Sequence, residues 1–364
     1  MFHTPILQRQ WDAHETAHPP VRATQFDDQA LLRAADVTRA LNVARPVLYW
    51  TDLLGAAIVG YAALTGALLL SGPLAIVSAI VAVLALYRAG SFIHELTHIK
   101  RGAVPGFKIA WNLLIGIPLL VPSFLYEGVH NQHHAKRYYG TVEDPEYLPL
   151  ALMKPWTLPI FLIAAALAPV AMLLRFAVLA PVSLLFPKLR ALVVRRYSGL
   201  QINPRFRRPA PQGDFARQWA WQESAASVWA ITLLGLTATG IISVREFAIL
   251  LAIAAGVMFL NQVRTLVAHL WENDGEPMSV TAQYLDSVNV PPPATLPVLW
   301  APVGLRYHAL HHLLPGLPYH NLGEAHRRLS AVLGAASPYH TASHRGISEL
   351  VKRLAASTFR RAHH

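Results

Sequence analysis

The sequence contains no cysteine and little charge: Asp, Glu, Lys and Arg make up 14% of its 364 residues, against about 25% in soluble domains. The absence of cysteine excludes disulfides, zinc ribbons, thiolate-bound iron–sulfur clusters and cysteine nucleophiles. Any metal ion must therefore be bound by His, Asp or Glu. The low charge and the 54% hydrophobic content favour one membrane-embedded unit over two soluble domains.

Acidic residues are the scarcer charge, with 20 Asp and Glu against 31 Lys and Arg, which gives a formal net charge of +11. This excess suits contacts with anionic lipid, an acidic redox protein or an anionic head group. The basic residues flank apolar spans, so nucleic acid is not an expected partner. Residues 1–45 contain no apolar core segment, so we expect the first membrane span, and not a cleaved signal peptide, to direct insertion.

Four apolar segments have the length of about 17–20 residues that a helix needs to span a bilayer. Ser, Gly and Pro at 71–73 form a turn signal between the first two segments, and residues 244–246 separate the other two. We therefore predict two transmembrane helical hairpins, with spans at 53–70, 74–90, 225–243 and 247–268.

Two further apolar stretches, 109–126 and 155–187, are interrupted by prolines. A single helix over the second stretch would be roughly 50 Å long, which exceeds the hydrocarbon thickness of a bilayer. Arg175 near its centre would also be costly in lipid. We expect both stretches to form interfacial or re-entrant helices that do not cross.

The distribution of basic residues predicts the orientation of the chain. The outer turns carry almost no positive charge, whereas residues 188–217 and the C-terminal region are strongly basic. The positive-inside rule places these segments and the N-terminus in the cytoplasm. We expect one all-α, multi-pass domain over 1–364 in a bacterial inner membrane, with a cytosolic N-terminal segment (1–50), a histidine-rich cytosolic cap, a cytosolic loop (274–297) and a basic cytosolic tail (330–364).

Three histidine clusters interrupt this apolar pattern: HELTH at 94–98, HNQHH at 130–134 and HALHH at 308–312. Spacings of three and four residues place side chains on one face of a helix, so each cluster can direct two or three imidazoles at one point. A lone HxxxH usually consists of two solvated histidines, but three such clusters together indicate a metal site. His269, at the end of the second hairpin, is either a further ligand or an interfacial histidine. The candidate metal ligands are His94, His98, His130, His133, His134, His269, His308, His311 and His312.

Nine ligands are too many for one octahedral ion, and two ions would take four or five each. Neutral imidazole suits iron, zinc and copper, but catalytic zinc has three protein ligands and a water, so an iron pair fits better. Carboxylates could orient the imidazoles, or lie on the surface or cap helices; the candidates are Glu95, Glu127, Asp144 and Asp274. Arg264 could bind an acidic head group or extend to the bilayer edge. His320 and His326 lack the multi-histidine spacing and are left out.

At these residues the chain resembles the membrane fatty acid desaturase superfamily. Members carry HxxxH or HxxxxH, then HxxHH, then a late HxxHH that is preceded by an additional histidine. The segments TVEDP at 141–145, HHLLP at 311–315 and PYHNL at 318–322 also resemble the segments that follow the family's second and third clusters. The resemblance covers residues 53–329 and implies that the nine histidines bind two catalytic iron ions (Fe2+/Fe3+).

The resemblance implies O2-dependent oxidation of an unactivated C–H bond in a long acyl chain or lipid. Loss of a second hydrogen gives an alkene, and transfer of oxygen gives an alcohol; histidine clusters do not separate these outcomes. We expect fatty acid desaturation first. The alternatives are a fatty acid, alkane or carotenoid hydroxylase, a decarboxylase that forms terminal alkenes and, from another class, a metal transporter, whose ligands should lie at the membrane midplane.

Two departures from the family pattern concern iron ligation and electron supply. Some desaturases place an asparagine four residues before the extra histidine, where this chain has Thr265, and the nearest asparagine is Asn261. No electron-donor domain is fused to the chain, so the resemblance implies a separate donor of the ferredoxin, rubredoxin or cytochrome type.

The substrate should enter a narrow, mostly apolar tunnel that runs from the metal centre between the hairpins and the interfacial helices. Basic residues should line its mouth, because most acyl carriers are anionic. Gly90 and Ala89 either set the width of this tunnel or allow close packing of helices.

Overall fold

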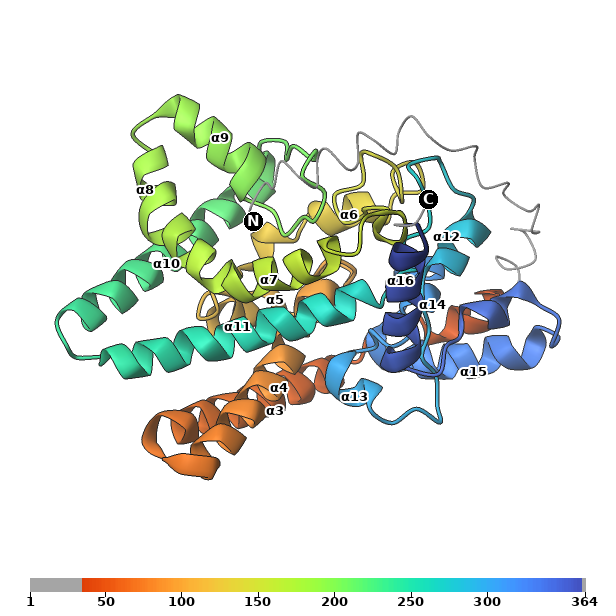
Figure 1. Ribbon diagram of the computed structural model, residues 1–364, viewed down its shortest axis with the longest axis horizontal. Coiled ribbons are helices and arrows are strands. Elements are labelled where there is room, and N and C mark those ends of the chain that lie inside the picture. Colours follow the sequence, from red (N-terminus) through yellow and green to blue (C-terminus); the bar gives the residue numbers. More distant parts are fainter. Residues whose placement is uncertain (1–34, 362–364) are drawn as a thin grey trace.

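The computed structural model describes residues 35–361, and within this range its regular secondary structure is helical, with three isolated β-bridges and no strand. The tips of two long hairpins point to one side of the molecule, whereas the short helices of the C-terminal half gather at the other (Figure 1). The predicted all-α membrane architecture is confirmed. Residues 1–34, within the predicted N-terminal segment, and His363 and His364 lie outside the described residues.

The first hairpin consists of α3 (Pro46–Leu69) and α4 (Gly72–Leu96). Proline in the first turn of each helix costs no hydrogen bond there. The two helices approach closely at Gly60, which has no side chain: a Cβ atom there would stand 2.7 Å from the side chain of Leu86. The predicted hairpin is confirmed, and α4 extends six residues beyond the predicted end at Gly90, so that it carries His94.

The second hairpin consists of α10 (Gly213–Ala238) and α11 (Val244–Leu266). Its turn lies at 239–243 and not, as predicted, at 244–246. Ser243 caps α11 by accepting from the Glu246 backbone N–H, and the Glu246 side chain accepts from the Ser243 backbone N–H in return. This capping box fixes the helix start at Val244.

Four helices in the described chain are long and apolar enough to cross a membrane, which is the predicted number. Three are α3, α4 and α11; the fourth covers 157–183 and joins α7 (Thr157–Leu174), the π-turn η5 (Arg175–Leu179) and α8 (Ala180–Ser183). These are not the four helices that we predicted, because 157–183 takes the place of the predicted span at 225–243. The helix α10 is not among the four because it ends at Ala238, so its apolar part, from 225 onward, is shorter than the predicted span 225–243 and its first twelve residues are largely polar.

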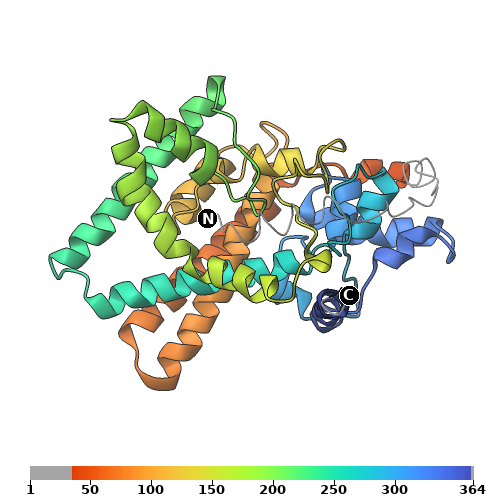
Figure 2. The same ribbon diagram turned by 45° about the horizontal axis from the view of Figure 1, so that its top comes forward.

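The path of the chain shows that 157–197 returns to the side from which it starts. Just before α7, the Ala151 N–H donates to the carbonyl of Trp271, near the end of α11. After α8 the ribbon turns sharply, and α9 (Pro187–Tyr197) leads back (Figure 2). The Ile202 N–H then donates to the carbonyl of Pro145, close to the second histidine cluster. The excursion therefore starts and ends on one side of the molecule, as a re-entrant segment would, but 157–183 is long and apolar enough to cross a membrane. The prediction that this stretch does not cross is thus not confirmed.

Arg175, which argued against a lipid-exposed helix, is buried and paired. Its guanidinium donates to the Glu223 carboxylate of α10 at 2.5 Å and to the Ser198 hydroxyl at 2.9 Å. A buried cation needs such partners, because its desolvation would otherwise exceed any gain from packing.

The apolar stretch 109–126 folds back on itself instead of forming one helix. It contains α5 (Phe107–Trp111), the π-turn η2 (Asn112–Gly116) and η3 (Ser123–Leu125). The Asn112 carboxamide accepts from the Ser123 N–H at 2.8 Å and donates to its hydroxyl at 3.0 Å. Its longest continuous helix, Phe107–Gly116, is too short to cross a bilayer, in agreement with the prediction.

The C-terminal half is more ordered than predicted. The expected loop 274–297 contains α12 (Val280–Asp286), and the expected tail contains η7 (Pro338–Ala342) and α16 (Ile347–Arg361). Leu350 and Leu354 of α16 are buried in two hydrophobic clusters, since an amphipathic helix is stabilised by burying its apolar face. The remaining helices of this half are α13 (Pro297–Trp300), α14 (His308–Leu313), η6 (Tyr319–Asn321) and α15 (Leu322–Val332).

Candidate metal centre

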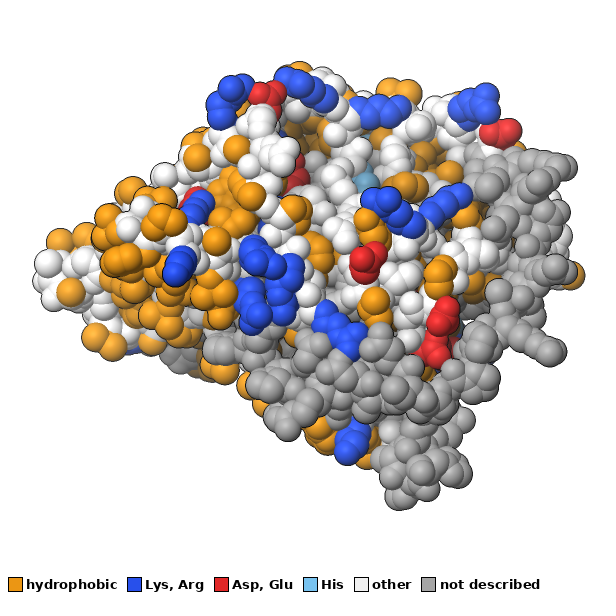
Figure 3. All heavy atoms as spheres, turned by 90° about the horizontal axis from the view of Figure 1, so that it is seen from above, with side chains coloured by type: hydrophobic (Ala, Val, Ile, Leu, Met, Phe, Trp, Pro, Cys, Tyr) orange, Lys and Arg blue, Asp and Glu red, His pale blue; other side chains and the backbone are white. Residues whose placement is uncertain are grey.

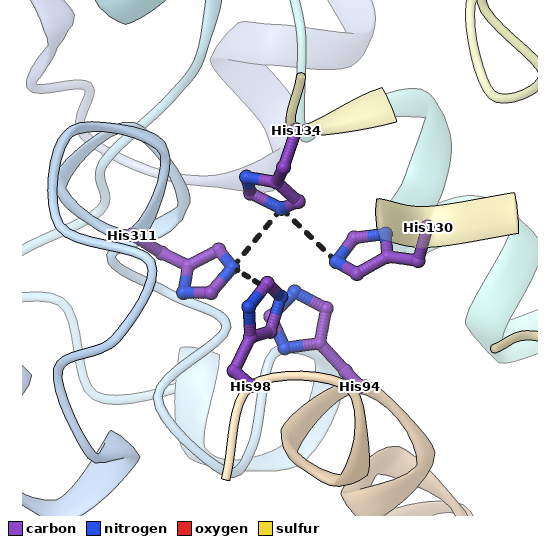
Figure 4. A group of neighbouring side chains, drawn as sticks. All are labelled: His94, His98, His130, His134 and His311. Carbon is purple, nitrogen blue, oxygen red and sulfur yellow. Dashed lines mark hydrogen bonds between the residues drawn. The ribbon is translucent and has the colours of Figure 1, made fainter. Parts of the chain in front are cut away.

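The structure brings all nine predicted histidines together as two adjacent groups, in each of which the candidate ligand atoms lie within 4.8 Å of one another. Figure 4 shows the larger group, in which rings from three parts of the chain point at a common centre. The five-histidine group comprises His94, His98, His130, His134 and His311. The four-histidine group comprises His133, His269, His308 and His312.

The division follows one rule: histidines four residues apart share a group, and the histidine between them joins the other. His130 and His134 belong to the five-histidine group while His133 joins the four-histidine group. In the third cluster His308 and His312 belong to the four-histidine group, and His311, which lies between them, joins the five-histidine group. Residues four apart differ by about 40° around a helix, whereas adjacent residues differ by about 100°, so adjacent imidazoles point at different centres.

Short structural elements set the positions of these helices. Gly128, with φ +78°, begins α6 (Val129–His133) with a backbone conformation that favours glycine. The segment 287–290 runs between His269 and α14: the Val288 N–H donates to the Ala268 carbonyl at 3.0 Å, and the Ala309 N–H donates to the Val288 carbonyl at 3.1 Å. Backbone pairing therefore places His269 beside the third cluster.

The spacing of ring nitrogens fits metal binding. Two nitrogens at right angles around an ion at about 2.0–2.1 Å are about 2.9 Å apart. In the five-histidine group Nε2 of His134 lies 3.0 Å from that of His130 and 3.2 Å from that of His311 (Figure 4). In the four-histidine group Nε2 of His308 lies 2.9 Å from that of His269. Both ring nitrogens of His94 are buried and have no hydrogen-bond partner among the described residues, and a metal ion would supply one.

Carboxylates and tyrosines orient three of the rings through Nδ1. The His133 Nδ1 lies 2.9 Å from the Asp144 carboxylate. The His269 Nδ1 lies 2.8 Å from the Tyr139 hydroxyl, which donates to Asp286 at 3.0 Å. An Nδ1–H donated to such a partner fixes the tautomer and leaves the Nε2 lone pair for a metal.

The His130 ring is held in the same way, by a tyrosine and a carboxylate. Its Nδ1 lies 2.8 Å from the Tyr126 hydroxyl and 3.2 Å from the Glu146 carboxylate. Glu146 follows Asp144 by two residues, so its position in the acidic segment was a signal that the sequence analysis missed. Asp286 and Tyr139 carried no such signal, because they are brought to His269 only by the fold.

Of the four carboxylates proposed as orienting groups, only Asp144 is confirmed. Glu95 accepts from the Tyr49 hydroxyl at 2.7 Å, and Glu127 accepts from the Lys108 ammonium at 2.5 Å. Asp274 has no hydrogen bond to any of the nine histidines within the described chain. These three assignments were wrong, because sequence proximity to a ligand does not determine the direction of a side chain.

Burial keeps most of these imidazoles neutral, which is the form that binds metal. It lowers the pKa of His98 to about 4. His133 is the exception: burial lowers its pKa, but the charge of Asp144 outweighs this effect and raises it. Burial raises the pKa of Glu146 to about 7 and that of Asp286 to about 6. Burial also lowers the pKa of His130, His134, His269, His308, His311 and His312.

A cavity of about 210 Å³ is lined by His94 and by residues of α4, α7 and α11. Gly90 lines it, and a Cβ atom there would meet nothing within 4 Å. Ala89, in contrast, is fully buried in the core and its carbonyl accepts from the Trp111 indole, so it is a packing residue. The apolar part of the wall includes Trp111, Ile115, Leu119, Phe161, Ala164, Ala168 and Val257.

The polar part of the cavity wall clarifies several weaker assignments. Arg264 is buried, lines the cavity and lies 3.5 Å from the His308 Nδ1, so it does not extend to the bilayer edge. Thr265 and Asn261 also line the cavity. Arg196 of α9 is the second arginine of the wall and agrees in part with the expected basic mouth.

His320 and His326 lie apart from the metal centre, as their spacing suggested. The His320 Nδ1 pairs with Asn321 at 3.0 Å, and the His326 Nδ1 pairs with the Tyr339 hydroxyl at 2.8 Å. Neither histidine belongs to the two groups.

Comparison with known proteins agrees with this site. Residues 67–344 match the fatty acid desaturase family. The chain is also 47% identical over 332 residues to a protein named ceramide hydroxylase from Caulobacter vibrioides (strain NA1000 / CB15N), and the match covers 91% of this chain and 94% of that relative. The chain therefore belongs to the fatty acid desaturase family and is a membrane di-iron oxidoreductase.

Proposed function

We propose that the chain hydroxylates the acyl or long-chain-base portion of a ceramide-like lipid, using O2 and an iron pair bound by the nine histidines. The observation that carries this proposal is the largely apolar cavity that His94 of the five-histidine group lines. A long alkyl chain in this cavity would present a C–H bond to the metal centre.

The choice of hydroxylation over our first expectation, desaturation, is supported by the similarity to the ceramide hydroxylase. That similarity extends over nearly the full length of both chains. Hydroxylation takes one oxygen atom of O2 into the product and releases the other as water, with two electrons and two protons supplied from outside. Desaturation consumes the same electrons but leaves no oxygen in the lipid, so the two reactions differ in a measurable way.

The chain's own residues would bind, orient and shield the reacting groups. The iron pair supplies the oxidising chemistry when it is bound. Asp144, Glu146 and the Tyr139–Asp286 pair hold three imidazoles in position for the ions. The apolar wall excludes water from the alkyl chain and aligns it toward His94. Small shifts of the substrate against the metal centre can redirect the outcome, so the shape of this wall decides which carbon reacts.

We further propose that the metal centre lies on the cytosolic side of a bacterial inner membrane. The hairpin tips are apolar and exposed: Leu69 is 77% exposed and Val244 is 75% exposed. Apolar side chains gather at the hairpin end in Figure 3, and Lys and Arg side chains lie across the middle of the same face. The positive-inside rule assigns the part of the molecule that carries these basic side chains, and not the apolar hairpin tips, to the cytoplasm.

Electrons would come from a separate donor of the ferredoxin, rubredoxin or cytochrome type. The net charge of +11 favours association with an acidic donor, because opposite charges steer encounter. Two electrons for each hydroxylation require two encounters with a one-electron carrier.

Reconstitution tests the proposal. The purified enzyme is assayed under 18O2 with a reduced ferredoxin, and ceramides, free fatty acids, acyl thioesters and alkanes are offered in parallel. The proposal predicts two irons per chain and a ceramide product that is 18 mass units heavier. A product two mass units lighter would establish desaturation. Exchangeable zinc without any lipid product would favour a metal transporter.

A further inference from the structure

Two residues that line the cavity each carry a buried polar atom that has no hydrogen-bond partner in the described chain. Oε1 of Gln201, a residue 4% exposed, is an acceptor without a donor. Nε of Arg264, a residue 8% exposed, is a donor without an acceptor. Both residues line the cavity. Buried groups of this kind are costly to leave unpaired, so together they indicate a polar ligand.

The backbone on either side of Gln201 is bound to the segments that carry the second histidine cluster. The Leu200 N–H donates to the Leu125 carbonyl at 2.8 Å, and the Ile202 N–H donates to the Pro145 carbonyl at 2.9 Å. The Asn203 carboxamide donates to the carbonyl of Asp144 at 2.8 Å, and the side chain of Asp144 orients His133. Gln201 is therefore fixed beside the metal centre.

The orientation of the Gln201 carboxamide leaves its oxygen free. Its Nε2 donates to the Phe206 carbonyl at 3.4 Å. A Cβ atom at Gly199 would stand 2.7 Å from the Gln201 Oε1, so glycine at that position leaves room for this oxygen. Arg264 approaches from α11, with its guanidinium 3.5 Å from the His308 Nδ1. Both unpaired atoms thus belong to residues next to metal-site segments.

The structure assigns to Gln201 and Arg264 the recognition of a secondary amide, an inference that rests on the proposed function. An amide offers one N–H, which would donate to the Gln201 Oε1, and one carbonyl oxygen, which would accept from the Arg264 Nε–H. An ester, a thioester or a carboxylate offers acceptors only and would leave the Gln201 oxygen unpaired. The substrate class is therefore an N-acylated long-chain amine.

This placement also limits where oxidation occurs. The amide is held by two residues next to metal-site segments, and the apolar wall that includes Ile115, Leu119 and Val257 receives an alkyl chain. The C–H bond nearest the metal centre then lies within a few bonds of the amide, and not in the middle of the chain.

The experiment compares a ceramide with the ester analogue of the same chains, in which oxygen replaces the amide N–H. Loss of one buried hydrogen bond should lower kcat/KM by about tenfold, so the wild type should prefer the amide by about this factor. Three variants are compared with it. Gln201→Met removes the acceptor, Gln201→Glu keeps an acceptor while losing the donor to Phe206, and Gln212→Met makes the same change at an exposed position.

We expect Gln201→Met to lose the preference for the amide while two irons remain bound. Gln201→Glu and Gln212→Met should keep the preference within about threefold, and fragmentation of the product should place the hydroxyl close to the amide. The inference is overturned if Gln201→Met keeps the wild-type preference, if Gln201→Glu loses it as fully as methionine does, or if the hydroxyl lies in mid-chain. Failure of the wild type to oxidise any ceramide would instead reject the proposed function.

Discussion

The two histidine groups differ in their relation to the substrate cavity and in how firmly their rings are held. His94 of the five-histidine group lines the cavity, whereas no member of the four-histidine group does. Within residues 35–361, both ring nitrogens of His94 and the Nδ1 of His311 are without a hydrogen-bond partner, although Tyr126 and Glu146 hold the His130 ring of the same group. In the four-histidine group two of the four rings, His133 and His269, are held by carboxylates, directly or through a tyrosine.

This difference indicates a division of labour. Under the proposed function, the five-histidine group would meet the substrate directly through His94, which lines the cavity. The four-histidine group adjoins the cavity through Arg264, whose guanidinium lies 3.5 Å from the His308 Nδ1, and carboxylates orient two of its rings. Mutations on the two sides should therefore have different consequences for substrate selection, even where both abolish turnover.

The largest effect should follow the removal of one ligand from either group. His311→Ala and His312→Ala should each lower turnover by more than about 100-fold, because loss of an orienting partner alone costs about 10- to 100-fold. Iron content should fall from two ions to about one in each variant. Metal analysis and product formation measure both effects.

His320→Ala is the matched control for these ligand variants, because this histidine pairs with Asn321 outside both groups. It should retain activity and iron. Full turnover by His311→Ala would contradict the assignment of two separate metal sites. The same conclusion would follow if His311→Ala and His312→Ala both lost the same iron ion.

A smaller effect should follow the removal of an orienting carboxylate. Asp144→Asn should weaken binding of the ion in the four-histidine group, and Glu146→Gln should weaken binding of the ion in the five-histidine group. Each change should lower activity or metal affinity by about 10- to 100-fold. Mössbauer spectra of the iron-loaded enzyme should show two iron signals, and Asp144→Asn should alter one of them while Glu146→Gln alters the other.

Glu127→Gln is the control for the carboxylate variants, since Glu127 pairs with Lys108 and with no metal-site histidine. It should leave both iron signals unchanged. If Asp144→Asn and Glu146→Gln altered the same signal, the assignment of one carboxylate to each group would fail.

A selective effect should follow a change in the cavity wall, on the substrate side only. Gly90→Leu should fill open space beside His94 and shift the preference toward shorter alkyl chains by several-fold, without loss of iron. Competition between substrates of graded chain length measures this shift. Gly235→Leu on α10, where a Cβ atom also meets nothing within 4 Å, should change nothing. If Gly90→Leu left the preference for chain length unchanged, the reacting alkyl chain would not lie beside Gly90.

Labelling should separate the metal end from the hairpin tips without affecting activity. The chain has no cysteine, so an introduced cysteine is unique. An impermeant thiol reagent applied outside intact cells should label Ser71→Cys and Arg245→Cys at the hairpin tips. It should label Gln212→Cys, just before α10, only after lysis. Labelling of Gln212→Cys from outside would reverse the proposed orientation.

The sequence predicted the long hairpins well and their limits less well. Continuous apolar runs identify a membrane helix because lipid offers no partner for polar groups, but they do not show where a helix continues through polar residues. For this reason α10 begins at Gly213 and α4 reaches His94, beyond the predicted ends. The Ser243–Glu246 capping box is visible in the sequence. It would have placed the second turn before Val244, where the structure has it.

The sequence by itself determined that this is a helical membrane protein with eight histidines in ligand spacing and His269 as a ninth candidate, because hydropathy and the helical repeat are local properties of the chain. Only the tertiary structure decided how the histidines divide into five and four, and it placed Asp286, Tyr139 and Gln201 at the site. These residues carry no local pattern: Tyr139 and Asp286 are 147 positions apart, yet their side chains meet. Contacts of this kind arise from the packing of distant segments, which sequence spacing does not encode.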